Sequence, residues 1–537
     1  MSIRKLLVAN RGEIALRVFR TCERLGIETV AVVAPDDAGS LHARSAGAAV
    51  PIGSYLDAAE HVRAAREAGA DAIHPGYGFL AESADFAAAV EAAGLTWVGP
   101  PADALRLGGD KLAAKRVATG AGVPTLPTGD PAAIGFPLLV KAAAGGGGRG
   151  MRVVRDPAEL AGAAEAAARE AAAAFGNGTL FYERYLERPR HVEVQLLADA
   201  HGTTLALGER DCSVQRRHQK VVEETPAPGL APAMRAGLAD AAVAFARGIG
   251  YRGAGTAEFL VDGDDFFFLE LNGRIQVEHP VTEEVSGIDL VEQQLRIAAG
   301  ERLVTDRRKA RGHAVEARLY AEDPRTFLPQ PGRIDRLRLP PDVRVDAGVA
   351  AGDEVGAAYD PMIAKLIARG TTREAALDAL AAALAETEVG GVTTNLAFLR
   401  WLVAHPAFRD GRVSTAFLTE FPPLSPPPHR LPAGPWRGAW RLNLPPPAPA
   451  PPPDVDDAAH AHAQHEGSSN VTAPMPGTVL EVRVAAGDRV AARAPLVVLE
   501  AMKMEHPVAS PFEATVKAVH AGPGDRVAAG QLLVELA

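Results

Sequence analysis

The sequence predicts a multidomain α/β protein with a small all-β domain at its C-terminal end. Three observations lead to this prediction. The first hundred residues alternate strand-like and helix-like segments, residues 255–272 form two strand-like runs around a turn, and residues 470–537 contain an internal repeat. A chain of 537 residues is long enough for roughly three or four domains, each with its own core.

The opening segment is typical of a βαβ unit. Apolar residues 3–9 predict a buried strand, residues 13–25 have the spacing of an amphipathic helix, and residues 29–33 predict a second strand. This order predicts a parallel sheet. The loop at residues 10–13 lacks the G-x-G-x-x-G fingerprint of a dinucleotide site, so nucleotide binding there is disfavoured. Turn geometry alone explains the glycines and the proline of residues 74–80, and we assign that loop a structural role.

Residues 255–278 contain the densest group of candidate site residues. Glu258 lies on the run 255–261, and a turn at residues 262–265 joins this run to the apolar residues 266–269. We expect strand spacing to continue beyond this point, which places five polar side chains on one face: Glu270, Asn272, Arg274, Gln276 and Glu278. Carboxylate and amide oxygens on paired strands are the ligands that Mg²⁺ prefers. The alternative is a surface hairpin with cross-strand ion pairs.

A predicted strand that ends at Lys141 runs into a glycine-rich loop with four successive glycines at residues 145–148. A lysine beside exposed backbone N–H groups suits phosphate oxygens. The pattern is not a Walker A loop, because the lysine precedes the glycines. Lys111, at the start of a predicted helix, is a second candidate for a phosphate contact. The alternatives are a flexible hinge and a surface lysine.

Three further segments border the same region. Residues 181–186 predict a strand end that passes into a turn, where backbone amides could meet adenine. Residues 191–196 alternate polar and apolar side chains, which predicts a strand with one polar face. The cationic run 215–220 leads directly into strand-like residues 221–224, so we favour a site over the solvated loop that a charge run usually forms.

Composition excludes several classes of partner. A net charge of −10 gives no basic surface for nucleic acid or an anionic membrane. No apolar run approaches the length of a membrane span, and the apolar start of the chain stops at Asn10, too early for a signal peptide. The only cysteines, Cys22 and Cys212, offer no disulfide framework and suit a reducing compartment. We therefore expect a cytoplasmic protein without nucleic-acid or membrane partners.

The last hundred residues divide into a linker and a repeat. Residues 422–453 contain 14 of the 42 prolines, which predicts an extended linker. Beyond it, residues 477–479 match residues 514–516, and residues 487–491 match residues 524–528, both at an offset of 37. Two similar all-β halves predict a flattened barrel with pseudo-twofold symmetry.

Five long motifs make the chain resemble biotin carboxylase. They occupy residues 8–17, 74–79, 145–151, 215–220 and 274–283. The likeness spans roughly residues 1–425 and implies an ATP-grasp fold. It divides the chain into an N-terminal biotin carboxylase domain (1–110), an ATP-grasp domain with a glycine-rich lid (111–310), a C-terminal biotin carboxylase domain (311–421), the proline-rich linker (422–469) and a biotin carboxyl carrier domain (470–537).

The resemblance implies a role for each candidate residue. The nucleotide would contact Lys111, Lys141, Gly146, Gly147, His191, Gln215 and His218, with Glu183 and Leu186 at the adenine. The metal ligands would be Glu258, Glu270 and Asn272. Bicarbonate would bind among Lys220, Arg274, Gln276 and Val277, with Glu278 as general base and Arg344 as the cation beside biotin.

Three positions depart from the usual pattern of this family. Ala144 replaces the first glycine of a five-glycine run, Arg184 stands where lysine is usual, and Gly273 replaces a larger residue. Arg184 changes a contact near the adenine, because arginine and lysine differ in shape and donors. Gly273 could loosen Arg274. None of the three departures removes a catalytic group.

Lys503, set between two methionines, resembles the biotinyl acceptor of a biotin carboxyl carrier domain. The chain as a whole resembles the alpha chain of a biotin-dependent acyl-CoA carboxylase of the acetyl- or propionyl-CoA type. This implies ATP-dependent carboxylation of biotin by bicarbonate through carboxyphosphate, with Mg²⁺ or Mn²⁺ as the metal. The implied partners are a carboxyltransferase beta chain, biotin protein ligase and further copies of the carboxylase domains.

Two alternatives remain at this point. The same modules could serve a pyruvate or urea carboxylase. A biotin-carrying scaffold protein with an inactive ATP site is the non-enzymatic alternative, and the intact set of candidate residues argues against it.

Overall fold

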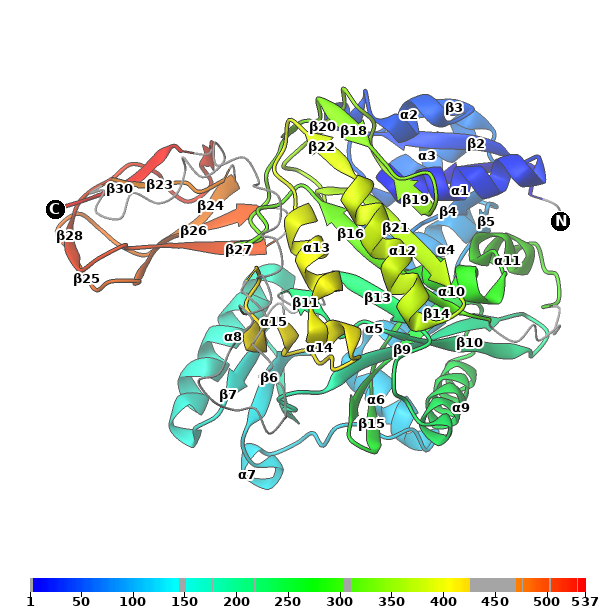
Figure 1. The fold of residues 1–537 in the computed structure, drawn as a ribbon, viewed down its shortest axis with the longest axis horizontal. Helices are drawn as coiled ribbons and strands as arrows, with labels where there is room; N and C mark the ends of the chain where they lie inside the picture. Colours follow the sequence, from blue (N-terminus) through cyan, green and yellow to red (C-terminus); the bar gives the residue numbers. More distant parts are fainter. Residues whose placement is uncertain are drawn as a thin grey trace, which may run out of the picture.

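The computed structural model of the chain describes residues 3–143, 151–175, 177–216, 219–303, 311–424, 470–475, 477–501, 504–528 and 530–537. It shows a multidomain α/β protein with a separate all-β domain, which confirms the predicted fold class (Figure 1). Among the described residues, no helix is both long and apolar enough to cross a membrane.

The N-terminal domain is a five-stranded parallel sheet of order β3-β2-β1-β4-β5. Its strands are β1 (Lys5–Val8), β2 (Glu28–Val33), β3 (Ala48–Pro51), β4 (Ala72–His74) and β5 (Thr96–Trp97). Alternate residues of β1 serve the two faces: Leu6 and Val8 pack in the same core as helix α1 (Gly12–Leu25), whereas Leu7 packs with α3 (Ala58–Ala68) and α4 (Ala84–Ala92). Both faces are therefore covered by helices, as in other parallel sheets, and the predicted βαβ opening is confirmed.

The central sheet has eight strands in the order β15-β14-β9-β10-β13-β16-β21-β19. They are β9 (Arg190–Ala198), β10 (Thr204–Asp211), β13 (Val222–Thr225), β14 (Gly253–Asp262), β15 (Asp265–Asn272), β16 (His313–Tyr320), β19 (Arg344–Ala347) and β21 (Met362–Gly370). Every pairing in the sheet is antiparallel. Helix α9 (Pro232–Gly248) packs on one part of it, and α12 (Arg373–Glu386) packs on another.

A smaller sheet lies outside this central sheet. Its strands are β6 (Leu138–Ala142), β7 (Arg152–Val154) and β8 (Leu180–Arg184), in the order β7-β6-β8, and helix α8 (Leu160–Phe175) covers it. Four side chains form a small core of their own: Leu138, Val140, Val154 and Ala167.

The remaining elements are short or connect these sheets. The helices are α2 (Leu41–Ser45), α5 (Ala102–Gly109), α6 (Lys111–Gly120), α7 (Pro131–Ile134), α10 (His279–Ser286), α11 (Leu290–Ala298), α13 (Leu396–Ala404), α14 (Pro406–Arg409) and α15 (Phe417–Glu420). The strands are β11 (Gln215–Arg216), β12 (Gln219–Lys220), β17 (Gly332–Arg333), β18 (Arg336–Arg338), β20 (Glu354–Val355) and β22 (Glu388–Gly390).

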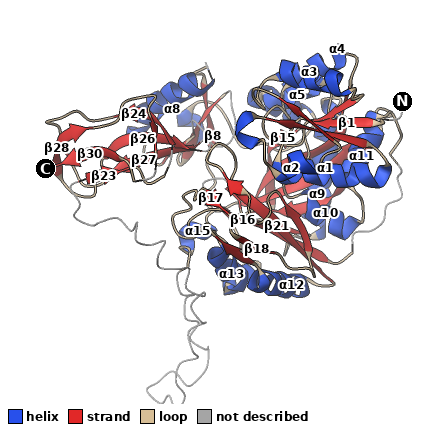
Figure 2. Ribbon diagram, turned by 90° about the horizontal axis from the view of Figure 1, so that it is seen from above, coloured by secondary structure: helices blue, strands red, loops and turns tan. Residues whose placement is uncertain are grey.

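The C-terminal domain consists of two four-stranded sheets, β23-β30-β28-β25 and β27-β26-β24-β29. Its strands are β23 (Asn470–Thr472), β24 (Gly477–Val482), β25 (Arg489–Val490), β26 (Pro495–Ala501), β27 (Met504–Ala509), β28 (Ala514–Val519), β29 (Arg526–Val527) and β30 (Leu532–Leu536). Strands β24, β25 and β26 each begin 37 residues before β28, β29 and β30, so the predicted repeat and pseudo-twofold arrangement are confirmed. In both views this domain lies at the opposite end of the molecule from the N-terminal sheet (Figures 1 and 2).

One expectation is wrong: strand spacing does not continue to residue 278. Strand β15 ends at Asn272, which pairs with Thr256, and residues 273–278 form a loop before α10. The backbone N–H of Gly273 donates to Glu82 Oε1 at 3.1 Å, and a Cβ atom on Gly273 would lie 2.7 Å from the side chain of Leu105. Packing against α5 therefore turns the chain away from the sheet, and glycine at this position allows the close approach.

Candidate active site

Lys220 is the centre of a buried cluster of carboxylates. Its Nζ atom lies 2.5 Å from Glu193, 2.8 Å from Glu258 and 2.6 Å from Glu278, so three acidic residues from different parts of the chain face one ammonium group. Burial works to lower the pKa of Lys220, but the three carboxylates outweigh it and hold that pKa well above its ordinary value. Lys220 therefore remains a cation in the folded protein.

Arg210, from β10, is fully buried and fixes the rear of this cluster. Its guanidinium donates to Glu193 at 2.5 Å and to Gln276 Oε1 at 2.8 Å, and it also donates to Gln195 Oε1 at 2.7 Å. A planar guanidinium with five donors holds several acceptors in one fixed geometry. Arg210 thereby positions Gln276, one of the predicted residues, although the sequence analysis did not identify Arg210 itself.

Glu278, the residue before α10, accepts from two cations. One carboxylate oxygen accepts a hydrogen bond from Lys220 Nζ, and the other accepts one from Arg318 Nη2 at 2.9 Å. Burial tends to raise the pKa of Glu278, but Lys220, Arg318 and Arg210 together hold that pKa well below its usual range. Glu278 is therefore an oriented, ionised carboxylate, and Arg318 is a second residue that the sequence analysis missed.

The polar side chains of residues 273–278 reach the cluster because this segment is a loop that turns towards it. They do not lie on alternate positions of a strand. Gln276 Nε2 donates to Glu258 Oε1 at 2.8 Å. Arg274 Nη2 donates to Asn272 Oδ1 at 2.8 Å, and its Nε atom lies 3.2 Å from Glu82. The predicted neighbours are thus brought together, although the predicted strand is absent.

The predicted metal ligands lie on adjacent strands. Glu258 and Glu270 are directly opposite each other in the register of β14 and β15, and Asn272 Nδ2 lies 2.9 Å from Glu258 Oε1. Burial and then the charge of Glu258 raise the pKa of Glu270, while Lys111 and Lys141 oppose this rise only in part. A buried carboxylate, Glu258, and a half-buried one, Glu270, that repel each other are suited to a divalent cation, which would favour the ionised form of both. The residues therefore fit Mg²⁺ or Mn²⁺.

The predicted nucleotide residues lie between α6 and the small sheet. Lys111 begins α6, whose first turn is capped by the side chain of Asp110. Lys141 Nζ on β6 lies 2.6 Å from Glu183 on β8. A further lysine, Lys115, pairs with the same carboxylate and was not identified from the sequence.

Other predicted residues have defined partners in the structure. His191 Nδ1 and Gln215 Nε2 lie 2.9 Å apart, and Leu186 follows β8. The carbonyl of Val277 accepts from Lys365 Nζ at 2.9 Å. Among the described residues, Arg344 forms no ion pair with a member of the Lys220 cluster. It pairs instead with Glu283 on α10 at 2.9 Å and with Asp346 at 3.0 Å.

Four predicted site residues and one departure lie outside the residues that the structure describes. They are Gly146, Gly147, His218 and Lys503, together with Ala144. Arg184, a second departure, lies on β8 and its Nη1 atom donates to the carbonyl of Ile134 at 3.4 Å. Residues 502–503 connect β26 to β27, whose end residues Ala501 and Met504 are paired.

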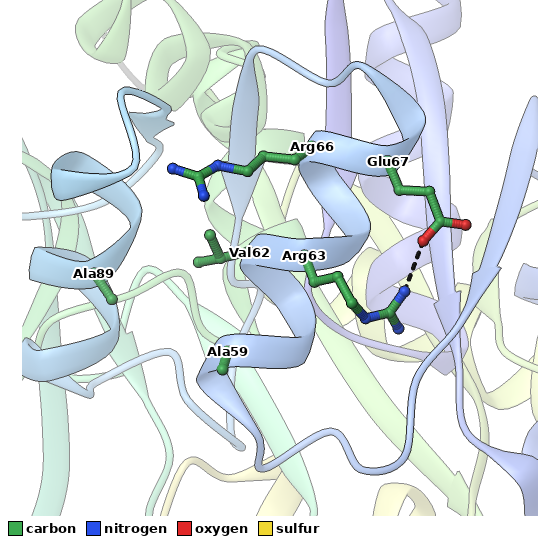
Figure 3. Close-up of a pocket in the computed structure, with 6 residues that line it drawn as sticks. All are labelled: Ala59, Val62, Arg63, Arg66, Glu67 and Ala89. Carbon is green, nitrogen blue, oxygen red and sulfur yellow. Dashed lines mark hydrogen bonds and ion pairs between the residues drawn. The ribbon is translucent and has the colours of Figure 1, made fainter.

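A shallow hollow between α3 and α4 contains none of the predicted residues (Figure 3). Two arginines line it, Arg63 and Arg66, together with Glu67. Arg63 is paired with Glu67 at 2.6 Å, so its charge is already balanced on the surface of the same helix. We assign no function to this hollow.

Two further carboxylates lie behind the cluster. Glu223 on β13 and Glu316 on β16 face each other in register, and Glu223 is ion-paired with Arg318. Neither oxygen of Glu316 has a hydrogen-bond partner among the described residues. Burial, reinforced by Glu223, raises the pKa of Glu316 well above its ordinary value, although Lys365 opposes this rise. Glu316 is therefore expected to retain its proton well above the pH at which an exposed glutamate ionises.

Replacing Glu316 with glutamine should stabilise the protein increasingly as the pH rises. A carboxyl group whose pKa is higher in the folded state makes its full contribution to the free energy of unfolding below its unfolded pKa of about 4.3. That contribution is lost as the pH rises through the folded pKa. Glutamine does not titrate, so the melting temperature of the variant minus that of the wild type should increase between about pH 6 and about pH 9. The exposed replacement Glu23→Gln is the control. A difference that does not change with pH would contradict the assignment.

Comparison with known families agrees with this geometry. Residues 2–105 match "Biotin carboxylase, N-terminal domain", and residues 316–420 match "Biotin carboxylase C-terminal domain". Residues 128–306 match "Carbamoyl-phosphate synthase L chain, ATP binding domain", and residues 469–536 match "Biotin-requiring enzyme".

Individual relatives cover the same part of the chain. Biotin carboxylase of Haemophilus influenzae is 48% identical over 439 residues, which is 78% of this chain and 98% of that protein. The mitochondrial methylcrotonoyl-CoA carboxylase subunit alpha of Arabidopsis thaliana is 50% identical over 442 residues, again 78% of this chain. The chain spans only about 60% of the length of that plant relative.

Solved structures extend the likeness to the fold. A biotin carboxylase–β,γ-ATP complex from Campylobacter jejuni has a TM-score of 0.76 and 41% identity, covering 78% of this chain and 99% of that one. The biotin carboxylase domain of a 2-oxoglutarate carboxylase from Hydrogenobacter thermophilus has a TM-score of 0.77 and 44% identity, covering 79% of this chain and 98% of that one. That structure holds MgADP, ADP and bicarbonate. The expected ATP-grasp fold is confirmed, and the chain belongs to the biotin carboxylase family.

Proposed function

We propose that this chain carboxylates biotin with bicarbonate at the expense of ATP, through carboxyphosphate. The observation that supports this most directly is the buried cluster in which Lys220 and Glu278 lie beside the Glu258–Glu270 carboxylate pair. Cations that can hold an anion, a carboxylate that can accept a proton and a place for a divalent metal are the parts that this reaction requires.

Bicarbonate binds among Lys220, Arg274, Gln276 and Val277 in this proposal. Lys220 and Arg274 are both half-buried, and two such cations offset the cost of moving an anion out of water. Glu278 then accepts the bicarbonate proton. Its Oε1 atom lies 2.6 Å from Lys220, so an anion bound by Lys220 would lie beside this carboxylate. Bicarbonate becomes a competent nucleophile towards phosphorus only when it loses that proton.

The nucleotide binds between α6 and the small sheet. Its proposed contacts are Lys111, Lys141, Gly146, Gly147, Glu183, Leu186, His191, Gln215 and His218. Glu258, Glu270 and Asn272 would hold Mg²⁺ or Mn²⁺, which neutralises negative charge on the transferring phosphate when it is bound. The lysines contribute to the same electrostatic stabilisation.

Arg344 is proposed to stabilise the negative charge that develops on the ureido group of biotin. Its guanidinium is tied to Glu283 on α10, the helix that begins directly after Glu278. One short helix therefore links the proposed base to the proposed biotin-side cation. Biotin itself would be attached to Lys503 by a biotin protein ligase.

We further propose that the chain is the alpha subunit of an acyl-CoA carboxylase, with the domain limits given by the sequence analysis and with its carboxylase domains assembled as a homo-oligomer. The acetyl- or propionyl-CoA assignment rests on the resemblance, and the plant and Dictyostelium discoideum relatives named methylcrotonoyl-CoA carboxylase add a third acyl group to test. A cytoplasmic location is likewise a proposal, because those relatives are named mitochondrial.

The purified chain should hydrolyse ATP in response to bicarbonate and biotin, yet should carboxylate no acyl-CoA. Acetyl-, propionyl- and 3-methylcrotonoyl-CoA would each be supplied with labelled bicarbonate, first with the chain alone and then with a carboxyltransferase beta chain added. Acid-stable label should form only in the second case. Turnover of an acyl-CoA by the chain alone would contradict the subunit assignment, and an absence of bicarbonate-dependent ATP hydrolysis would favour the scaffold alternative.

A further inference from the structure

One buried carboxylate binds two lysines between α6 and the small sheet. Lys141 Nζ lies 2.6 Å from one oxygen of Glu183, and Lys115 Nζ is paired with the other oxygen. Glu183 is 2% exposed, Lys141 7% and Lys115 9%, so all three groups are removed from water. Two ammonium groups therefore share a single negative charge inside the protein.

The two lysines differ in how they are held. Lys115 Nζ also donates to the carbonyl of Leu126 at 3.2 Å, which gives it a second, uncharged anchor. Of the described residues, only Glu183 accepts a hydrogen bond from Lys141 Nζ, and the centroid of the Phe181 ring lies 6.0 Å from the same atom. Lys141 lies on the strand that leads into the glycine-rich segment, whereas Lys115 lies one helical turn after Lys111. Among the described residues, Lys115 is thus held by two hydrogen bonds and Lys141 by one.

Three lysines lie within electrostatic range of Glu183: Lys111, Lys115 and Lys141. Burial lowers the pKa values of Lys111 and Lys115, and the nearby charge of Lys141 lowers them further, while Glu183 and Glu270 restore only part of the loss. A group of neighbouring lysines is stabilised when an anion binds beside it. A nucleotide polyphosphate is the anion that the proposed function supplies.

We infer that Lys115 is a permanent counter-charge for Glu183, and that it allows Lys141 to leave Glu183 and bind the phosphates of the nucleotide. This inference rests on the proposed function and concerns the same site. Without Lys115, movement of Lys141 towards phosphate would leave Glu183 as an unpaired buried carboxylate, which is strongly unfavourable. Lys115 is therefore a positioning residue that determines nucleotide affinity without contacting the phosphates.

The test is a double-mutant cycle on the full chain, with binding of Mg–ADP measured by calorimetry so that no turnover is needed. Lys115→Met should weaken ADP binding by roughly tenfold, because Lys141 then remains the sole partner of Glu183. In a Glu183→Gln background the same change at Lys115 should have almost no effect, because no buried charge needs compensation. The Michaelis constant for ATP should follow the binding constant, while kcat should change by less than about twofold.

The matched control is Arg116→Met, which removes an exposed cation from the next position of the same helix. It should leave ADP affinity unchanged. If Lys115→Met does not fold, Lys115→Gln removes the same charge with a polar side chain and should give the same loss. Wild-type affinity in the Lys115 variant, or an equal loss in the Glu183→Gln background, would overturn the inference. A wild-type chain that binds no ADP would overturn the proposed function as well.

Discussion

Replacing Glu278 with glutamine should lower bicarbonate-dependent ATP cleavage by about a hundred- to ten-thousand-fold, which is the usual contribution of a general base. Glutamine keeps the shape of the side chain and loses its basicity. The structure explains why the base must be activated by its substrate. Lys220 and Arg318 hold the pKa of Glu278 low despite its burial, and an anion that draws Lys220 towards itself would weaken that hold.

Steady-state rates and nucleotide binding measured side by side decide this assignment. The ATP dissociation constant of the Glu278→Gln variant should stay close to that of the wild type, because Glu278 is not a proposed metal ligand. Glu270→Gln is the matched control: it removes a carboxylate on β15 and should instead alter the Mg²⁺ requirement. Near-normal turnover of the Glu278 variant, or a change confined to Mg–ATP binding, would show that Glu278 is not the base.

Replacing Lys503 with arginine should abolish both covalent biotin and acyl-CoA carboxylation, even with a carboxyltransferase chain present. A guanidinium remains protonated at physiological pH and cannot act as the nucleophile for biotin attachment. Carboxylation of free biotin should be largely unaffected, since the C-terminal domain has a hydrophobic core of its own, separate from the cores of the carboxylase domains.

A streptavidin blot and a free-biotin carboxylation assay measure these two outcomes. Lys517→Arg is the control, because Lys517 is an exposed lysine on β28 of the same domain and its replacement should leave biotin attachment intact. Detection of biotin on the Lys503→Arg protein would mean that another lysine is the acceptor.

The arrangement of the two carboxylates that we propose as metal ligands could be predicted from the local sequence pattern. Two strand-like runs joined by a tight turn fix which residues face each other, and Glu258 and Glu270 are indeed opposite in register. The same period-two pattern failed after Asn272. There the chain is turned by the packing of Gly273 against Leu105, a contact between segments more than a hundred residues apart that no local periodicity contains.

The residues that the sequence did not reveal are the buried partners of the predicted ones. Three of them lie on strands and form ion pairs with residues from other segments of the chain: Arg210, Arg318 and Glu223. A buried charge requires a partner, but the sequence does not say which partner the fold supplies. Lys115 is different, because its spacing of one helical turn from Lys111 was a usable local signal.

The pairing of strands between the two repeats of the C-terminal domain determines when during synthesis this domain can fold. Strand β24 of the first repeat pairs with β29 of the second, β25 pairs with β28, and β23 pairs with β30. Neither repeat can complete a sheet alone, yet the proposed acceptor Lys503 precedes β28, β29 and β30 in the chain. Since a protein leaves the ribosome from its N-terminal end, Lys503 emerges before the strands that complete its domain. A biotin ligase that recognises the folded domain would therefore leave unmarked any chain whose translation stopped before β30.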